Sequence, residues 1–140
     1  MNKKLLLFLS LPAIVLSIML SSCAQEEDPP PTDDRDKFVG SWTCPEQSTQ
    51  NGPSTFTIHI NKSTSNTSQI LIENFYAAGF SNSATANVSG SSFSASGQPY
   101  TSFTITSLSG TSTGASTLTM NYIIQNGSIY DTCSAACTKQ

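Results

Sequence analysis

Four cysteines and one histidine are the side chains of this sequence best suited to covalent or metal chemistry. Structural zinc sites hold the metal with closely spaced pairs of such ligands, commonly two cysteines separated by two residues. No two cysteines of the chain have that spacing. We therefore expect no metal site and no cofactor, although four ligand-type residues lie beyond residue 40: Cys44, His59, Cys133 and Cys137.

The acid–base residues do not form a recognisable catalytic set. His59 lies on the polar side of an alternating segment, so we expect it to be an ordinary solvent-exposed side chain. Glu73 and Asp131 have the chemistry of an acid and a base, but a catalytic site needs a partner that orients the reacting group. Nothing in the sequence brings these two carboxylates together. We expect no enzyme activity.

The first 22 residues have the pattern of an export signal. Lys3 and Lys4 precede a mostly apolar run from Leu5 to Leu20, and a basic start followed by an apolar core is typical of a secretory signal peptide. The run is shorter than the roughly 20 apolar residues that a membrane-spanning helix needs. We expect residues 1–22 to be cleaved off.

An aliphatic residue, two small residues and a cysteine follow one another at Leu20, Ser21, Ser22 and Cys23. This order resembles the lipobox of bacterial lipoproteins. The resemblance implies that Cys23 becomes the mature N-terminus and carries acyl chains on its sulfur and amine. Two or more acyl chains hold a protein stably at a membrane without a spanning helix. An ordinary secretory signal with an incidental cysteine is the alternative.

Residues 23–36 join this anchor to the rest of the chain. After Cys23 the segment reads AQEEDPPPTDDRD, with six acids, three consecutive prolines and no large apolar side chain. Such a composition favours an extended, disordered tether. Its acidic cluster resembles the export signal of surface lipoproteins of Bacteroidota, which implies the outer face of the outer membrane, with the periplasmic face as the alternative.

Residues 37–140 have the composition of one weakly charged domain. Three lysines balance three acids, so the domain has no net charge and no basic stripe for nucleic acid. Twenty serines and sixteen threonines are interleaved with aromatic and β-branched residues, which favours strands over disorder. We expect neither a nucleic-acid partner nor a strongly charged one.

Apolar and polar residues alternate repeatedly along this domain. In TFTIHI, the side chains of Phe56, Ile58 and Ile60 share one face, as expected for a half-buried strand. QILIENFY is less regular, which indicates a bulge or a strand that is covered on both faces. Clusters of Gly and Asn, such as Gly110 to Gly114, are expected to form turns. We expect strands near 38–45, 54–62, 68–76, 84–89, 92–96, 101–108, 115–124 and 128–138.

Eight short strands joined by tight turns predict an all-β, antiparallel meander. An up-and-down barrel is the favoured architecture because closure removes the exposed sheet edges, and a two-sheet sandwich is the alternative. Pairing of the first strand with the last would place Cys44 opposite Cys133 if Gly40 lies near Cys137. We therefore predict a Cys44–Cys133 disulfide, with Cys137 left over.

The domain opens with Gly40, Ser41 and Trp42, a G-x-W pattern that resembles the start of lipocalin barrels. The resemblance implies that the tryptophan closes one end of the barrel. The succession FVGSW, IENFYAAG, TANVSGSSF, LTMNY and YDTCSAACTK is similar to small lipocalin-like lipoproteins of Bacteroidota, a mostly uncharacterised group. The chain departs from true lipocalins near its C-terminus, where Lys139 is the only cation and no arginine is present to stack on Trp42.

Two functions remain open at this stage. The lipid-anchored domain either binds a small apolar or amphipathic ligand inside its barrel, or has a filled core and contacts glycans or a protein partner with its outer surface. At eight strands a barrel is just wide enough for either arrangement. The candidate ligand or core side chains are Trp42, Phe56, Phe75, Phe93, Phe103 and Tyr122.

Overall fold

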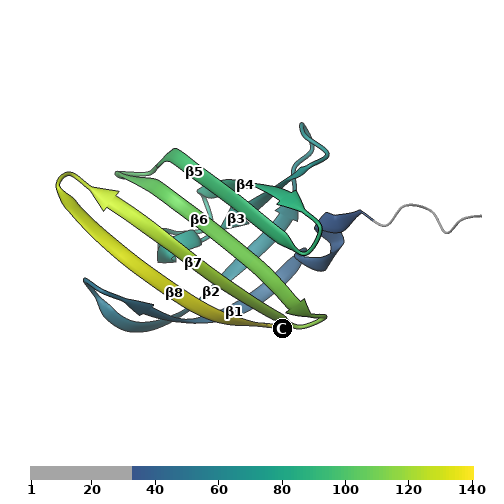
Figure 1. Ribbon diagram of the computed structural model, residues 1–140, viewed down its shortest axis with the longest axis horizontal. Helices are drawn as coiled ribbons and strands as arrows, with labels where there is room; N and C mark the ends of the chain where they lie inside the picture. The colour runs from purple at the N-terminus through teal and green to yellow at the C-terminus, as the bar shows by residue number, and fades with distance from the viewer. Residues whose placement is uncertain (1–32) are drawn as a thin grey trace, which may run out of the picture. The chain divides into compact units, whose positions relative to one another are not determined.

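A computed structural model describes residues 33–140, which form a closed barrel of eight antiparallel strands (Figure 1). Each strand pairs with the next along the chain, and β8 pairs with β1. The predicted up-and-down barrel is confirmed, and the sandwich alternative is wrong. The strands are β1 (Gly40–Ser48), β2 (Gly52–Lys62), β3 (Gln69–Glu73), β4 (Ser83–Ser89), β5 (Ser92–Tyr100), β6 (Phe103–Gly114), β7 (Thr117–Asn126) and β8 (Ile129–Lys139).

The predicted signal peptide and Cys23 lie outside the described residues. Within residues 33–140, no helix is long and apolar enough to cross a membrane.

The side chains alternate across the barrel wall as the sequence pattern predicts. In β7, Leu118, Met120 and Tyr122 are buried inside, while the residues between them are exposed. The register of β6 against β7 shifts between Ile105 and Ser107, so the buried positions of β6 change parity after this irregularity. The result is one continuous apolar core inside the barrel.

The barrel has two different ends, which we name by their loops. The tether end holds the start of the described chain, loops 63–68, 90–91 and 115–116, and the C-terminus (right in Figure 1). The distal end holds loops 49–51, 74–82, 101–102 and 127–128 (left in Figure 1).

Trp42 lies in the core near the tether end and is fully buried. Its indole N–H donates to the carbonyl oxygen of Phe38 at 2.7 Å. The ammonium nitrogen of Lys139 lies 5.3 Å from the centre of the indole ring, within the range of a cation–π contact. Lys139, the only cation near the C-terminus, therefore packs over Trp42 where true lipocalins would have an arginine.

A short 3₁₀ helix, η1 (Asp34–Lys37), packs residues of the predicted tether onto the tether end. The guanidinium of Arg35 binds the Asp33 carboxylate and donates to the carbonyl oxygens of Ser63, Asn66 and Gln69 at 3.1, 3.2 and 3.4 Å. The prediction of a disordered tether reaching residue 36 is wrong at its C-terminal end. An acidic segment alone would not be expected to pack against a domain, but here the buried Arg35 binds both Asp33 and the loop after β2.

The distal end is plugged by the chain between β3 and β4. The predicted strand over 68–76 is wrong beyond Glu73, because Asn74 takes a left-handed backbone with φ of 56°. Its side chain donates to the carbonyl oxygen of Thr57 at 2.7 Å and accepts from the backbone N–H of Gly79 at 2.8 Å. The chain then enters a second 3₁₀ helix, η2 (Phe75–Ala77), whose first residue is fully buried.

The disulfide joins Cys44 to Cys137, so the predicted Cys44–Cys133 pair is wrong. Trp42 pairs with Lys139 in the register of β1 against β8, which places Cys44 opposite Cys137 with their Cα atoms 4.1 Å apart. Cys133 is a free, buried thiol. The predicted register of β1 against β8 differs from the observed one by an even number of residues. Such a shift keeps every side chain on the same face of the sheet, so the apolar pattern cannot distinguish the two registers.

Replacement of Cys137 by Ala should lower the free energy of unfolding by about 3–5 kcal/mol, because it removes a covalent closure between the first and last strands. Cys133→Ala is the matched control, since Cys133 is equally buried on the same strand and leaves the bridge intact. Urea denaturation measures both variants, and non-reducing peptide mapping of the wild type locates the bridge. A peptide that links Cys44 to Cys133 would contradict the observed register.

Candidate functional site

The six side chains predicted to line or fill the barrel belong to its core or pack against it. Trp42, Phe75, Phe93 and Tyr122 are at most 2% exposed, and the rings of Phe75 and Tyr122 pack with their centres 4.6 Å apart. The remaining two are partly buried against the same core: Phe56 and Phe103. Four hollows of the described chain all open to solvent, and their walls include only Phe103 and Tyr122 of the six.

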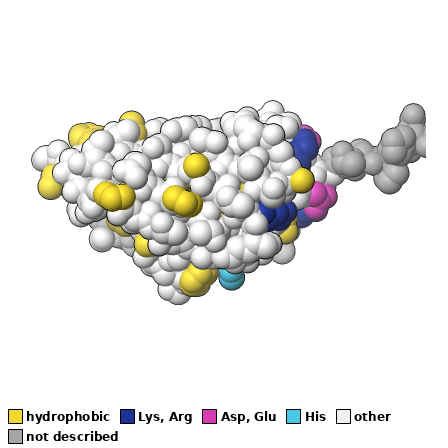
Figure 2. All heavy atoms as spheres, turned by 90° about the horizontal axis from the view of Figure 1, so that it is seen from below, with side chains coloured by type: hydrophobic (Ala, Val, Ile, Leu, Met, Phe, Trp, Pro, Cys, Tyr) yellow, Lys and Arg dark blue, Asp and Glu magenta, His cyan; other side chains and the backbone are white. Residues whose placement is uncertain are grey.

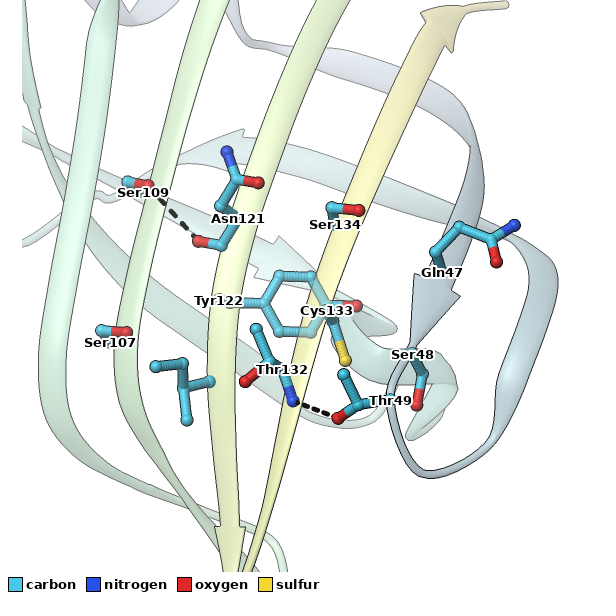
Figure 3. Close-up of a pocket in the computed structure, with 11 residues that line it drawn as sticks. Gln47, Ser48, Thr49, Ser107, Ser109, Asn121, Tyr122, Thr132, Cys133 and Ser134 are labelled. Atoms are coloured by element: carbon cyan, nitrogen blue, oxygen red, sulfur yellow. Dashed lines mark hydrogen bonds between the residues drawn. The ribbon is translucent and has the colours of Figure 1, made fainter.

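One of these hollows is a groove of about 440 Å³ on the outer surface of β6, β7, β8 and β1 (Figure 3). Its outward side chains are mostly neutral hydroxyls and amides, such as those of Ser107, Asn121 and Ser134, together with the aliphatic side chain of Ile123. Ser109 donates across it to the backbone carbonyl oxygen of Asn121 at 3.3 Å. Such a surface offers hydrogen bonds but no group that titrates near neutral pH.

A second hollow, which we call the distal pocket, lies at the distal end and measures about 320 Å³. It combines two aromatic rings, two aliphatic side chains, three carboxamides and one carboxylate. Its lining residues are Gln50, Asn51, Tyr76, Phe103, Ile124, Asn126, Ile129 and Asp131.

Asp131 is the most heavily hydrogen-bonded side chain at this end of the barrel, and only 4% of its residue surface is exposed. The hydroxyl of Ser48 donates to it at 2.6 Å, and the Tyr76 hydroxyl at 2.7 Å. The Thr49 hydroxyl, the Gln50 backbone N–H and the Asn51 amide donate at 3.1 Å each. The carboxylate thereby fastens the β1–β2 loop and η2 to β8.

These donors set the charge state of Asp131. Burial raises the pKa of the carboxyl, but the hydrogen bonds, led by that from Ser48, outweigh it and lower the pKa to about 2. Burial and the adjacent carboxylate raise the pKa of the Tyr76 hydroxyl. At neutral pH the pair is therefore an anion and a protonated phenol.

Two further polar groups lie inside the barrel near Asp131. Burial, together with the charge of Asp131, raises the pKa of Glu46, and one of its carboxyl oxygens has no hydrogen-bond partner within residues 33–140. Burial, together with the nearby carboxylates, raises the pKa of the Cys133 thiol to about 12. A thiol that stays protonated is a poor nucleophile.

The other residues with catalytic side chains are separated by the barrel wall. His59 and Glu73 face each other on the outer surface, with the imidazole Nδ1 3.8 Å from a carboxylate oxygen. Asp131 is buried on the inner side. The two carboxylates considered as an acid–base pair are thus not brought together. Within residues 33–140, no group of three or more metal-ligating side chains is close enough to hold a metal ion.

The sequence also contains one motif that is associated with hydrolases. Residues 110–114 read G-T-S-T-G, which matches the G-x-S-x-G spacing of hydrolase nucleophiles. That motif requires a sharp turn between a strand and a helix, whereas Ser112 lies within β6 and donates to the carbonyl oxygen of Gly114 at 2.9 Å. The local structure therefore does not present Ser112 as such a nucleophile.

The same stretch also corrects the turn predicted at Gly110 to Gly114, because both glycines belong to β6. A Cβ atom on Gly110 would overlap the Phe93 ring. This glycine is present to make room for a core aromatic side chain.

Comparison with known proteins supports the fold alone. No protein-family model and no curated protein sequence matches the chain. Among solved structures, a redesigned β-barrel is similar, with a TM-score of 0.57 and 9% sequence identity over 77% of this chain and 96% of that one. This likeness agrees with an eight-stranded antiparallel barrel and carries no function to this chain.

The network around Asp131 predicts a specific dependence of stability on pH. Because the folded-state pKa lies below the ordinary value of 3.8, the charged carboxylate stabilises the fold above about pH 4. This contribution should be lost as the pH falls from about 4 to about 2, and it amounts to about 2 kcal/mol.

Urea denaturation of the wild type and of Asp131→Asn at a series of pH values measures this contribution. The stability advantage of the wild type should shrink by about 2 kcal/mol over that range. Because the charge of Asp131 also raises the pKa of Glu46, both proteins are compared in a Glu46→Gln background, which removes that second titration. A difference that does not change with pH would contradict the assigned role of Asp131.

Proposed function

We propose that the chain is a lipid-anchored, non-catalytic barrel module of the bacterial outer membrane that binds its partner with its outer surface at the distal end. The observation that carries this proposal is the filled interior, in which Trp42 lies near one end and Phe75 plugs the other. A ligand held in the barrel would have to displace side chains that pack the core. The alternative of an interior apolar ligand therefore has little support, and the outer-surface module is favoured.

The arrangement of the chain supports the distal end as the binding end. The described chain begins with η1 at the tether end, so the segment that leads back to Cys23 joins the barrel there. Among residues 33–140, three large apolar side chains are half exposed, at 50 to 59%. All three lie on loops or strand starts of the distal end: Phe80, Ile129 and Tyr130.

The anchor and the location are proposed from the sequence. The basic start, the apolar run and the lipobox order before Cys23 support acylation. The acidic residues after it support display on the outer face, as in the Bacteroidota lipoproteins that the sequence resembles. A lipid anchor makes the membrane the first partner of the chain.

Replacement of Cys23 by Ser tests the anchor. The variant should be lost from the membrane fraction or accumulate with its signal peptide uncleaved, because no thiol is left to acylate. Fractionation and intact-mass measurement of the two proteins distinguish these outcomes. Unchanged membrane attachment of the variant would refute the lipoprotein assignment.

Surface display is tested by labelling a cysteine placed at the distal end. Ser128 lies in the β7–β8 turn and is exposed, whereas the natural free thiol Cys133 is 2% exposed. In intact cells, a membrane-impermeant maleimide should label Ser128→Cys but not the wild type. Labelling that requires permeabilised outer membranes would instead place the domain on the periplasmic face.

A further inference from the structure

The walls of the distal pocket have the geometry of a partial aromatic cage. The rings of Tyr76 and Phe103 have their centres 5.2 Å apart and lie nearly perpendicular, at 78°. Both side chains are partly exposed and line the pocket together with Ile124 and Ile129. The two rings meet edge to face and both line the pocket, so a compact group held there contacts both rings.

The carboxylate of Asp131 supplies a negative charge beside this corner. All its hydrogen-bond donors are neutral hydroxyl, amide and backbone N–H groups, so its charge is solvated but not neutralised. A positive charge within about 5 Å would be attracted by this carboxylate, and the attraction is stronger than in bulk water because the site is partly shielded from solvent.

The cations of the described chain are far from this site in the fold. Each of them lies at the tether end: Arg35, Lys37, Lys62 and Lys139. Three of them form ion pairs there with aspartates 33, 34 and 36. On the face seen in Figure 2, charged side chains gather at the tether end, whereas the opposite part of the barrel carries none. Within residues 33–140, the distal end therefore has no lysine or arginine that forms an ion pair with Asp131.

The hydrogen bonds of Asp131 decide which kind of cation suits the pocket. Its two oxygens already accept from five groups, so few lone pairs remain for a metal ion or for the three N–H donors of a primary ammonium. A quaternary ammonium has no such donors to satisfy, and it is attracted by ring faces and by a nearby negative charge.

We propose that the distal pocket binds the quaternary ammonium group of a small molecule or of a lipid head group. The inference rests on the proposed use of the distal end for binding and adds the chemistry of the ligand. The volume of about 320 Å³ is at the lower end of the range for ligand pockets and suits a compact head group. The Asn126 carboxamide also lines the pocket and can bind a neighbouring polar group of the ligand.

Calorimetric titration of the full-length chain in a nonionic, sugar-free detergent tests this inference with two probes of equal shape. Choline carries the charge, and 3,3-dimethylbutan-1-ol is its neutral counterpart. Choline should bind saturably, and the neutral alcohol should bind at least about tenfold more weakly. Equal binding of both probes, or no saturable choline binding up to about 100 mM, would overturn the inference.

A pair of variants locates the binding. Phe103→Leu keeps an apolar side chain and removes one ring of the cage, so choline affinity should fall by about threefold or more. Phe80→Leu is the matched control, because Phe80 is an exposed aromatic residue outside the pocket and its loss should leave the affinity unchanged. Retained affinity in Phe103→Leu, with thermal stability like that of the wild type, would exclude this site.

Further titrations separate the ligand sources. Vesicles of phosphatidylcholine distinguish a lipid head group from a free small molecule, and a trimethyl-lysine peptide that binds at least about tenfold more tightly than choline would overturn this choice of ligand. Saturable binding of glucose or N-acetylglucosamine in place of choline would overturn the ammonium assignment and leave the proposed outer-surface module intact. Failure of Ser128→Cys to be labelled on intact cells would count against the proposed display even if choline binds.

Discussion

The pairing of β8 with β1 is the interaction on which the rest of the structure depends. It gives every strand two neighbours, so no sheet edge is left to pair with another chain. The register places Cys44 opposite Cys137, and the disulfide joins the two strands there. Nearer the distal end, Asp131 on β8 binds the loop that follows β1. The seam of the barrel is thus held by backbone pairing, by a covalent bond and by a buried carboxylate.

Closure also determines how the interior is used. Alternating apolar residues from all eight strands face one enclosed space, and an eight-stranded barrel is small enough for side chains to fill it. Phe75 enters from η2 and Trp42 from β1, and both are fully buried. Because the space is occupied, the polar and aromatic groups that remain available lie on the outside of the barrel. The ends then differ in chemistry, with paired charges at the tether end and an anionic, aromatic pocket at the distal end.

The two-residue period of the sequence was sufficient to predict the fold class, the number of strands and most of the core. Local turns imposed by tertiary contacts were not predictable in this way. Asn74 ends β3 because its side chain forms hydrogen bonds with Thr57 and Gly79. Thr57 is distant in sequence and Gly79 lies in the following loop, so neither contact could be read from the alternating pattern. Gly110 is a residue type typical of turns, but it lies in β6, where the absence of a side chain leaves room for the Phe93 ring.

The candidate site was even less predictable from the sequence. Phe103 was recognised as an aromatic side chain of the core, and Asp131 was considered only as an acid. Nothing in the sequence indicates that the β1–β2 loop, η2 and β8 meet around that carboxylate. The cysteine pairing failed for a related reason, because a shift of an even number of residues preserves the apolar faces. Long-range register is fixed by barrel closure and not by local pattern.

The filled interior is tested most directly by energy transfer from Trp42, the single tryptophan of the chain, to an apolar fluorescent probe. A filled barrel predicts no saturable transfer that persists in Phe103→Leu, which alters the distal pocket. It also predicts that Phe75→Ala, which opens space in the core, binds a molecule as small as benzene, seen as a rise in melting temperature that the wild type lacks. Saturable transfer at one probe per barrel that is unchanged by Phe103→Leu would contradict the filled interior and restore a ligand-carrying barrel.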